Sequence, residues 1–311
     1  MKLVVLLVVL ALRRLDMAWP QAFLGRERFA RLLAPWRARV DDMGLPPTLA
    51  PVVRWLLLVL VPVIVVAVLM CLLHNVLWGL PGFIAGGVLL LWLLGAESEF
   101  RQQEDLLARG RMNDPAEFAE AAERHFGVDD NDQVAPDHLE VESMPADPAE
   151  PGYFTRLYRR ILRQDALQLF ATVFWLIVLG YWAALLYVLN LTLVRDENVH
   201  GSEQESEPSP ARLLHMALFW MPSRLLVLCL ALAGNFGRVA DAVSGRVWRL
   251  DDGEALLGAA LDGALDKPAP EASTTDQFQA GVDRLEELQG VLLRCLAIWL
   301  ILAAAWVVIT G

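Results

Sequence analysis

Five long apolar runs constrain this chain more than any other feature of its sequence. Each is close to the roughly 20 residues that a helix needs to cross a hydrocarbon core about 30 Å thick. Hydrophobic residues make up 56% of the 311 residues and gather in these runs, a concentration unlike that of ordinary water-soluble proteins. We therefore predict an all-α, polytopic helical membrane protein with about five transmembrane helices. The runs cover residues 55–73, 76–95, 167–194, 213–236 and 289–310.

The N-terminal residues Met1–Leu12 are also apolar but form a shorter run. As a helix they would rise only about 18 Å. Arg13 and Arg14 stand where a signal peptide would have small residues for cleavage. We predict that this segment is retained as an embedded N-terminal helix. Residues 22–40, where arginines alternate with large apolar residues, are predicted to form a basic amphipathic helix on the membrane surface.

The distribution of Lys and Arg between the runs predicts the topology. Residues 13–54 and 97–166 carry eight each and residues 237–288 carry five, whereas residues 195–212 carry two. Basic residues near the ends of membrane spans favour the cytoplasmic side. The three richer stretches are therefore predicted to be cytoplasmic, and the C-terminal Gly311 to lie on the opposite side.

We divide the chain into five segments on this basis. Within them, residues 97–126 are predicted to form a helix up to Gly110 and a second one from Asp114-Pro115, and residues 156–165 a basic helix. Residues 238–265 suggest two short amphipathic helices, broken near Asp251-Asp252-Gly253. The segments are 1–95 (embedded helix, basic amphipathic helix and first helical hairpin), 96–166 (cytoplasmic acidic helical loop), 167–236 (second hairpin), 237–288 (cytoplasmic amphipathic segment) and 289–311 (C-terminal span).

Several chemical classes do not fit the sequence. The net charge of −11 argues against binding to nucleic acid. The three cysteines and five histidines lack zinc-site spacing. The acidic tract at 129–132 lacks the glycine and glutamate that a calcium loop requires at later positions. We therefore predict no metal and no cofactor.

One charged residue interrupts the fourth run. A guanidinium in the middle of an apolar span costs about 3 kcal/mol on insertion scales, so Arg224 is expected to face a polar cavity, a carboxylate or an anionic ligand. Pro222 removes a backbone hydrogen bond and is expected to kink or break the helix there. An alternative is that Arg224 reaches the interface because the run consists of two half-segments. The predicted ligand-binding site comprises Arg224, Trp220, Pro222, Trp175 and Glu254, with Asp165 as a second acidic residue near a span end.

The sequence Trp-Met-Pro-Ser-Arg-Leu at 220–225, together with Phe-Trp-Leu-Ile-Val-Leu-Gly at 174–180, resembles the AmpE inner-membrane proteins. More distantly, the chain resembles the cobalamin-biosynthesis membrane synthases that attach an aminopropanol arm to cobyric acid. The likeness extends over most of the chain. Phe219 stands where AmpE relatives carry Asp. Arg163, Gln164 and Leu167 stand near the positions of the acidic and amide residues of the synthases, and they cannot perform carboxylate chemistry.

The resemblance implies a multi-pass protein of the bacterial inner membrane, in a family linked to the regulation of β-lactamase induction and the response to antibiotics. We expect a non-catalytic sensor or signalling modulator of cell-wall stress. Its expected partners are membrane lipids, an anionic ligand derived from the cell wall and a cytoplasmic protein. Two alternatives remain open: a membrane enzyme derived from the cobinamide synthase scaffold with an altered substrate, and a carrier of cell-wall fragments.

Overall fold

The computed structural model describes most of the chain as helices and turns, with no strand among the described residues, which confirms the predicted all-α class. The chain forms two compact units. The first unit comprises residues 1–98, 171–218 and 303–311, and the second comprises residues 99–170 and 219–302. The described residues are 2–14, 35–36, 38–40, 42, 50–74, 80–94, 99–126, 148, 150, 152–200, 209–249, 253–265 and 275–310.

Among the described residues, four helices are long and apolar enough to cross a membrane, which agrees with the predicted class of helical membrane protein. Gly82–Leu94 and Tyr181–Arg195 are apolar but shorter. The division of the chain into five segments and the side of the membrane on which each loop lies stay predictions. The four long helices are Val52–Leu73, Tyr153–Val178, Pro210–Ala233 and Gln277–Trp306.

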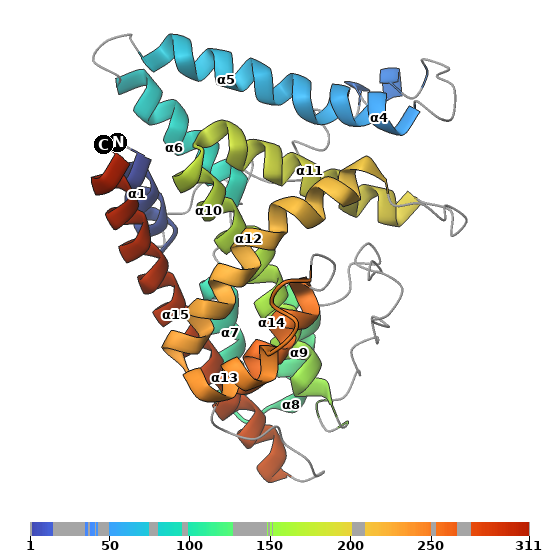
Figure 1. The fold of residues 1–311 in the computed structure, drawn as a ribbon. Helices are drawn as coiled ribbons and strands as arrows, with labels where there is room; N and C mark the ends of the chain where they lie inside the picture. The colour runs from blue at the N-terminus through green and yellow to red at the C-terminus, as the bar shows by residue number, and fades with distance from the viewer. Residues whose placement is uncertain are drawn as a thin grey trace. The chain divides into compact units, whose positions relative to one another are not determined.

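Among the helices that the structure describes, the most apolar ones belong to the first unit. Helix α5 exposes a row of aliphatic side chains, among them Val65 at 60% and Leu72 at 66% exposure. A helix that is apolar all round and still exposed fits a lipid environment. Gly86 on α6 lies so close to the Tyr181 ring of α11 that a Cβ would come within 2.7 Å of it. The helices of this unit are α1 (Lys2–Arg14), α4 (Ala50–Trp55), which continues through a π-helical turn into α5 (Val61–His74), α6 (Leu80–Leu94), α10 (Ala171–Val178) and α11 (Tyr181–His200) (Figure 1).

The expectation that residues 167–194 form one continuous span is wrong. The helix ends at Val178, and α11 begins at Tyr181. Gly180 has φ +103°, a conformation that glycine adopts without steric cost, and the amides of Leu179 and Gly180 both donate to the Trp175 carbonyl. The helix on the N-terminal side is longer than expected, because α9 (Tyr153–Asp165) continues through the π-helical turn Ala166–Phe170 into α10.

The second unit packs around a group of aromatic rings. Phe118 lies 5.2 Å from Phe278 and 5.8 Å from Phe154 between ring centroids. The Tyr158 hydroxyl donates to the Gly281 carbonyl over 2.7 Å, which ties α9 to α15. The unit contains α7 (Glu99–Arg111), α8 (Pro115–Phe126), α9, the C-terminal part of α12 (Pro210–Ala233), α13 (Phe236–Val243), α14 (Gly253–Ala264) and most of α15 (Thr275–Thr310).

Several predicted helix boundaries in the second unit are confirmed. The Asp114 carboxylate accepts from the amides of Ala116 and Glu117 at 3.0 and 3.1 Å, so it caps α8 at the predicted start. The two short helices predicted within 238–265 are α13 and α14, which lie side by side (Figure 1). They approach closely because Gly263 on α14 has no Cβ to meet the Val239 backbone of α13.

Some sequence predictions concern residues that are not described. Most of the amphipathic helix predicted at 22–40 and the acidic tract at 129–132 lie outside the described residues. The last helix, α15, begins at Thr275 and is 36 residues long, so it starts well before the apolar run at 289–310.

Candidate functional site

Helix α12 is continuous through Pro222 over all of its 24 residues, so the predicted break at this proline is wrong. A proline inside a helix leaves the carbonyl four residues earlier without its usual amide donor. That carbonyl belongs to Leu218, and it accepts a hydrogen bond from the Trp175 indole nitrogen at 3.2 Å. Trp175, predicted as a wall of the site, thus satisfies the backbone group that Pro222 frees.

Arg224 joins α12 to the turn at 244–249. Its Nε donates to the Val247 carbonyl at 3.0 Å, and its Nη2 donates to the Arg249 carbonyl. Nη1 donates to the Ser223 hydroxyl at 2.9 Å. The guanidinium carbon also lies 5.2 Å from the centroid of the Trp220 ring, one helical turn earlier. The planar fork of this arginine is therefore directed at backbone carbonyls of the second unit.

The N-terminus of α14 lies beside Arg224. A Cβ at Gly253 would be 3.2 Å from the Phe219 ring and 3.5 Å from the Arg224 Nη1 atom. The next residue, Glu254, pairs with Arg163 of α9, with 2.9 Å between the carboxylate oxygen and Nε. The structure therefore brings Arg224, Trp220 and the α14 residues 253–254 together within the second unit.

The two other predicted residues lie elsewhere. Asp165 is completely buried and accepts from the Gln103 side-chain amide at 2.8 Å, so it belongs to the contact between α9 and α7. Trp175 belongs to the first unit.

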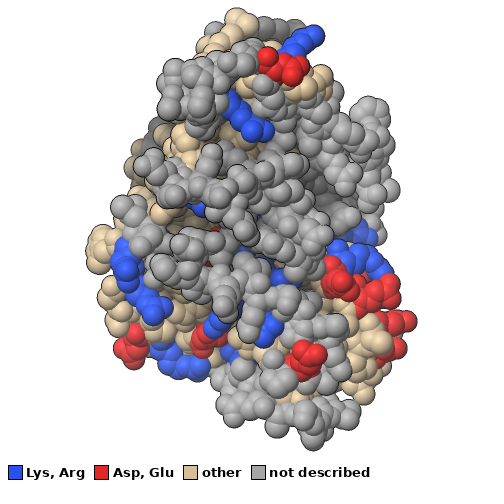
Figure 2. Space-filling view, turned by 90° about the vertical axis from the view of Figure 1, so that its right-hand side faces the viewer, with Lys and Arg blue, Asp and Glu red and all other residues tan. Residues whose placement is uncertain are grey.

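Sequence reasoning missed an ion-pair ladder between α9 and α14, formed by Arg159, Arg163, Glu254 and Asp262. Arg159 pairs with Asp262 at 3.0 Å, and Arg163 pairs with Glu254. The sequence does contain a signal for these ion pairs. Arg159 and Arg163 are four residues apart on α9, and Glu254 and Asp262 are eight residues apart on α14, so each pair lies on one face of its helix. On the face shown in Figure 2, acidic and basic side chains of the described residues also lie near one another.

The ladder reaches a third helix through Arg284 of α15, which sequence reasoning also missed. The Arg284 side chain is 5% exposed and lies 3.8 Å from the second oxygen of Asp262. Its guanidinium carbon lies 5.5 Å from the centroid of the Tyr158 ring. Asp262 therefore faces two arginines, one exposed to water and one buried.

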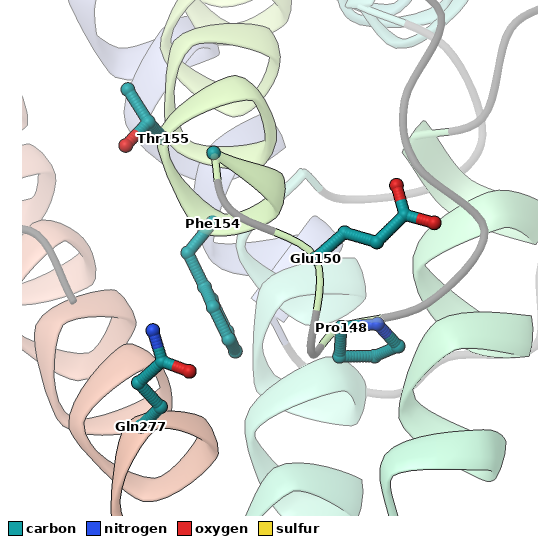
Figure 3. A pocket seen from close by; sticks show the side chains of 6 residues that line it. Pro148, Glu150, Phe154, Thr155 and Gln277 are labelled. Carbon is teal, nitrogen blue, oxygen red and sulfur yellow. The ribbon is translucent and has the colours of Figure 1, made fainter. Parts of the chain in front are cut away.

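A shallow hollow lies between the start of α9 and the start of α15. Its cavity volume is only about 10 Å³, room for roughly one water molecule and far below the 300–1,000 Å³ typical of small-molecule sites. Gln277 and Pro148 lie on either side of the Phe154 ring (Figure 3). The hollow is lined by Pro148, Glu150, Gly152, Phe154, Thr155 and Gln277.

Within the part of the chain that the structure describes, no group of three or more His, Cys, Asp or Glu residues is placed to hold a metal ion. Comparison with known proteins gave no match among family models, curated proteins or solved structures. The likeness to the AmpE proteins therefore rests on the residues quoted from the sequence.

Proposed function

We propose that this chain is a multi-pass protein of a bacterial inner membrane that senses or modulates a signal of cell-wall stress, linked to the regulation of β-lactamase induction, without catalysing a reaction. The resemblance to the AmpE proteins suggests this role. The four helices of membrane-spanning length and apolarity support the membrane part of the proposal.

The observation that carries the proposal is the set of contacts around Arg224. Through its side chain, α12 holds the carbonyls of Val247 and Arg249. Glu254, at the adjacent start of α14, holds Arg163 of α9. A displacement of α12 would therefore move the 244–249 turn and α14, and through α14 it would move α9. A movement of the apolar helix α12 would in this way be transmitted to the charged helices α14 and α9. A signalling role requires such a transmission.

The topology proposed from the basic residues is consistent with this route. The stretches 96–166 and 237–288, which we place in the cytoplasm, lie almost entirely within the second unit. A cytoplasmic protein partner would then meet both stretches on one compact unit.

We further propose that the ligand is an anionic fragment of the cell wall and that it binds at Arg224 and the start of α14. Backbone amides at a helix N-terminus favour negative charge, and α14 has 12 residues. A bidentate carboxylate or phosphate would compete with the carbonyls of Val247 and Arg249 for the Arg224 fork. Binding would release the turn from α12.

Thermal unfolding of the purified full-length protein with anionic muropeptides tests this proposal. A ligand at 100 times its dissociation constant adds about 2.7 kcal/mol to stability, which should raise Tm by on the order of 5 °C. Arg224→Leu should abolish the rise. Arg294→Leu, which removes an arginine from another apolar helix, should retain it. An equal rise in wild type and Arg224→Leu would show that the ligand binds elsewhere.

A separate test addresses the absence of catalysis. Arg163 is engaged with Glu254, and general acid–base chemistry needs suitable groups within hydrogen-bond reach of the reacting atoms. We expect that the chain does not restore growth on cobyric acid to a strain lacking its cobinamide synthase. Growth in that assay would favour the alternative of a membrane enzyme.

A further inference from the structure

We propose that residues 236–249 form an interfacial anchor that binds the anionic headgroups of a phospholipid leaflet. The anchor comprises Phe236, Arg238, Arg246, Trp248 and Arg249. This inference rests on the proposal above that α12 crosses a membrane, and it assigns a specific lipid contact to the segment whose turn Arg224 holds.

Two large rings of the anchor are exposed. Trp248 is 82% exposed and Phe236 is 57% exposed, whereas Val239 and Val243 form the buried side of α13. The two rings are thus left out of the packing of the second unit. Tryptophan is enriched where a membrane meets water, because its ring is apolar and its indole N–H is polar.

The charge of the anchor differs in sign from that of the whole chain. Residues 236–249 carry three exposed arginines and one acidic residue, Asp241, in a chain whose net charge is −11. A local positive charge beside exposed rings is the combination that binds anionic lipid surfaces. This charge complementarity favours a lipid leaflet over an apolar groove on a protein partner.

The anchor is held close to the end of α12. Helix α12 ends at Ala233 and α13 begins at Phe236, so two residues separate them. Two extended residues reach at most about 7 Å, and a bilayer has about 5–7 Å of headgroup region on each side of its hydrocarbon core. Phe236, at the start of α13, therefore lies near the depth of the headgroups.

Three hydrogen bonds fix the orientation of the anchor. Arg224 holds the carbonyls of Val247 and Arg249, the residues on either side of Trp248. Arg238 Nη2 donates to the Leu265 carbonyl at 2.6 Å, which holds α13 against the end of α14. Trp248 therefore lies on a turn whose backbone is already bonded to α12. Lipid binding would then cost little conformational entropy in this turn.

Hydrogen exchange of the full-length protein in nanodiscs tests the anchor. We would compare nanodiscs of phosphatidylcholine alone with nanodiscs that also contain phosphatidylglycerol. One arginine near an anionic lipid surface strengthens the membrane-binding constant by about fivefold. Amides of residues 236–249 should therefore exchange at least about fivefold more slowly in the anionic nanodiscs. Arg246→Gln should reduce this difference by about fivefold, and Trp248→Ala should speed exchange in both lipids.

Matched controls lie in the same unit. Met112→Ala removes an apolar side chain that is 70% exposed on the turn between α7 and α8, and Arg124→Gln removes an exposed arginine of α8. Neither should change exchange in 236–249. Exchange of the buried α9 amides, measured in the same samples, reports whether each variant is folded.

The outcomes separate this inference from the proposed function. A chain that enters neither type of nanodisc would overturn both. A chain that inserts, and whose residues 236–249 exchange equally in neutral and anionic lipid, would overturn the anchor alone. The same holds if protection of these residues appears only after a soluble protein partner is added.

Discussion

The Trp175 indole donates its N–H to the Leu218 carbonyl over 3.2 Å, and this carbonyl is the one that Pro222 leaves without a helical donor. The proline is therefore accommodated by a side chain from another helix, and α12 passes through it without a break. In an apolar environment an unpaired carbonyl would be costly. Trp175 and Pro222, which the sequence placed in one predicted site, are connected through this bond.

The first prediction concerns this bond. Trp175→Phe keeps a ring but removes the donor, so it should lower the free energy of unfolding by about 1–3 kcal/mol. Pro222→Ala restores an amide that can bond Leu218, so the double variant should recover most of the loss. Chemical unfolding in detergent would measure the coupling between the two positions. Trp182→Phe, at a Trp that is 43% exposed, is the control. If the changes in the free energy of unfolding of the two single variants simply add up in the double variant, Trp175 does not compensate for Pro222.

The second prediction concerns signalling through Arg224. Arg224→Lys keeps the charge but loses the planar fork that holds two carbonyls, so it should weaken β-lactamase induction. Arg224→Leu should reduce induction further. Both variants should still insert, because neither adds a charge to α12. A reporter of β-lactamase expression and membrane fractionation of each variant measure the two effects. Induction at the wild-type level in both variants would refute a role for this arginine.

The third prediction concerns the buried Arg284. Its Nε and Nη1 atoms are buried and have no hydrogen-bond partner among the residues that the structure describes, and the charge of its guanidinium faces Asp262 at 3.8 Å and the Tyr158 ring. Asp262→Asn should destabilise the protein by about 1–3 kcal/mol, because a buried charge would lose its partner. Arg284→Met should be close to neutral, because it removes the charge and keeps an apolar stem. Adding Arg284→Met to Asp262→Asn should then restore stability, and a double variant less stable than Asp262→Asn would contradict this account.

The fourth prediction compares two glycines of α15. A Cβ at Gly281 would overlap the Phe154 ring, whereas a Cβ at Gly290 would meet nothing within 4 Å. Gly281→Ala should therefore destabilise the protein by about 1–3 kcal/mol through overpacking. Gly290→Ala should stabilise it by up to about 1 kcal/mol, because alanine is the better helix former. Thermal unfolding of the two variants would measure the difference, and equal shifts would refute the close contact.

The fifth prediction concerns topology. Reporter fusions after Glu140 and Pro268 should indicate the cytoplasm, because the basic stretches around them favour that side. Fusions after Glu203 and Gly311 should indicate the periplasm. A periplasmic result at Glu140 would overturn the whole arrangement, whereas one at Pro268 would affect only the last two spans.

The local features of this fold could be predicted from the sequence. Apolar runs predicted helices of membrane-spanning character, because side chains without polar groups exclude water over the length of a bilayer. Asp114-Pro115 predicted the start of α8, since the aspartate is the residue that caps its first amides. The glycine and aspartates near 251–253 predicted the separation between two short helices. Each of these depends on residues close together in the chain.

The packing of distant segments could not be predicted in this way. Pro222 predicted a kinked or broken helix, because its sequence neighbours do not reveal that Trp175 satisfies the freed carbonyl. The apolar run that contains Gly180 predicted one continuous span, because hydropathy is insensitive to the backbone conformation of one glycine. The candidate site was only partly foreseen for the same reason: Arg224 stood out as a charge in an apolar run, whereas its carbonyl acceptors are more than 20 residues away.

The sequence by itself determined that this chain is built of apolar and charged helices and where many of them begin and end, because hydrophobicity and helix capping act over a few residues. Only the tertiary structure decided which charges pair, as between Arg163 and Glu254, and which backbone groups Arg224 holds. Such partners are chosen by distance in space, since hydrogen bonds and ion pairs act over a few ångströms whatever the separation along the chain.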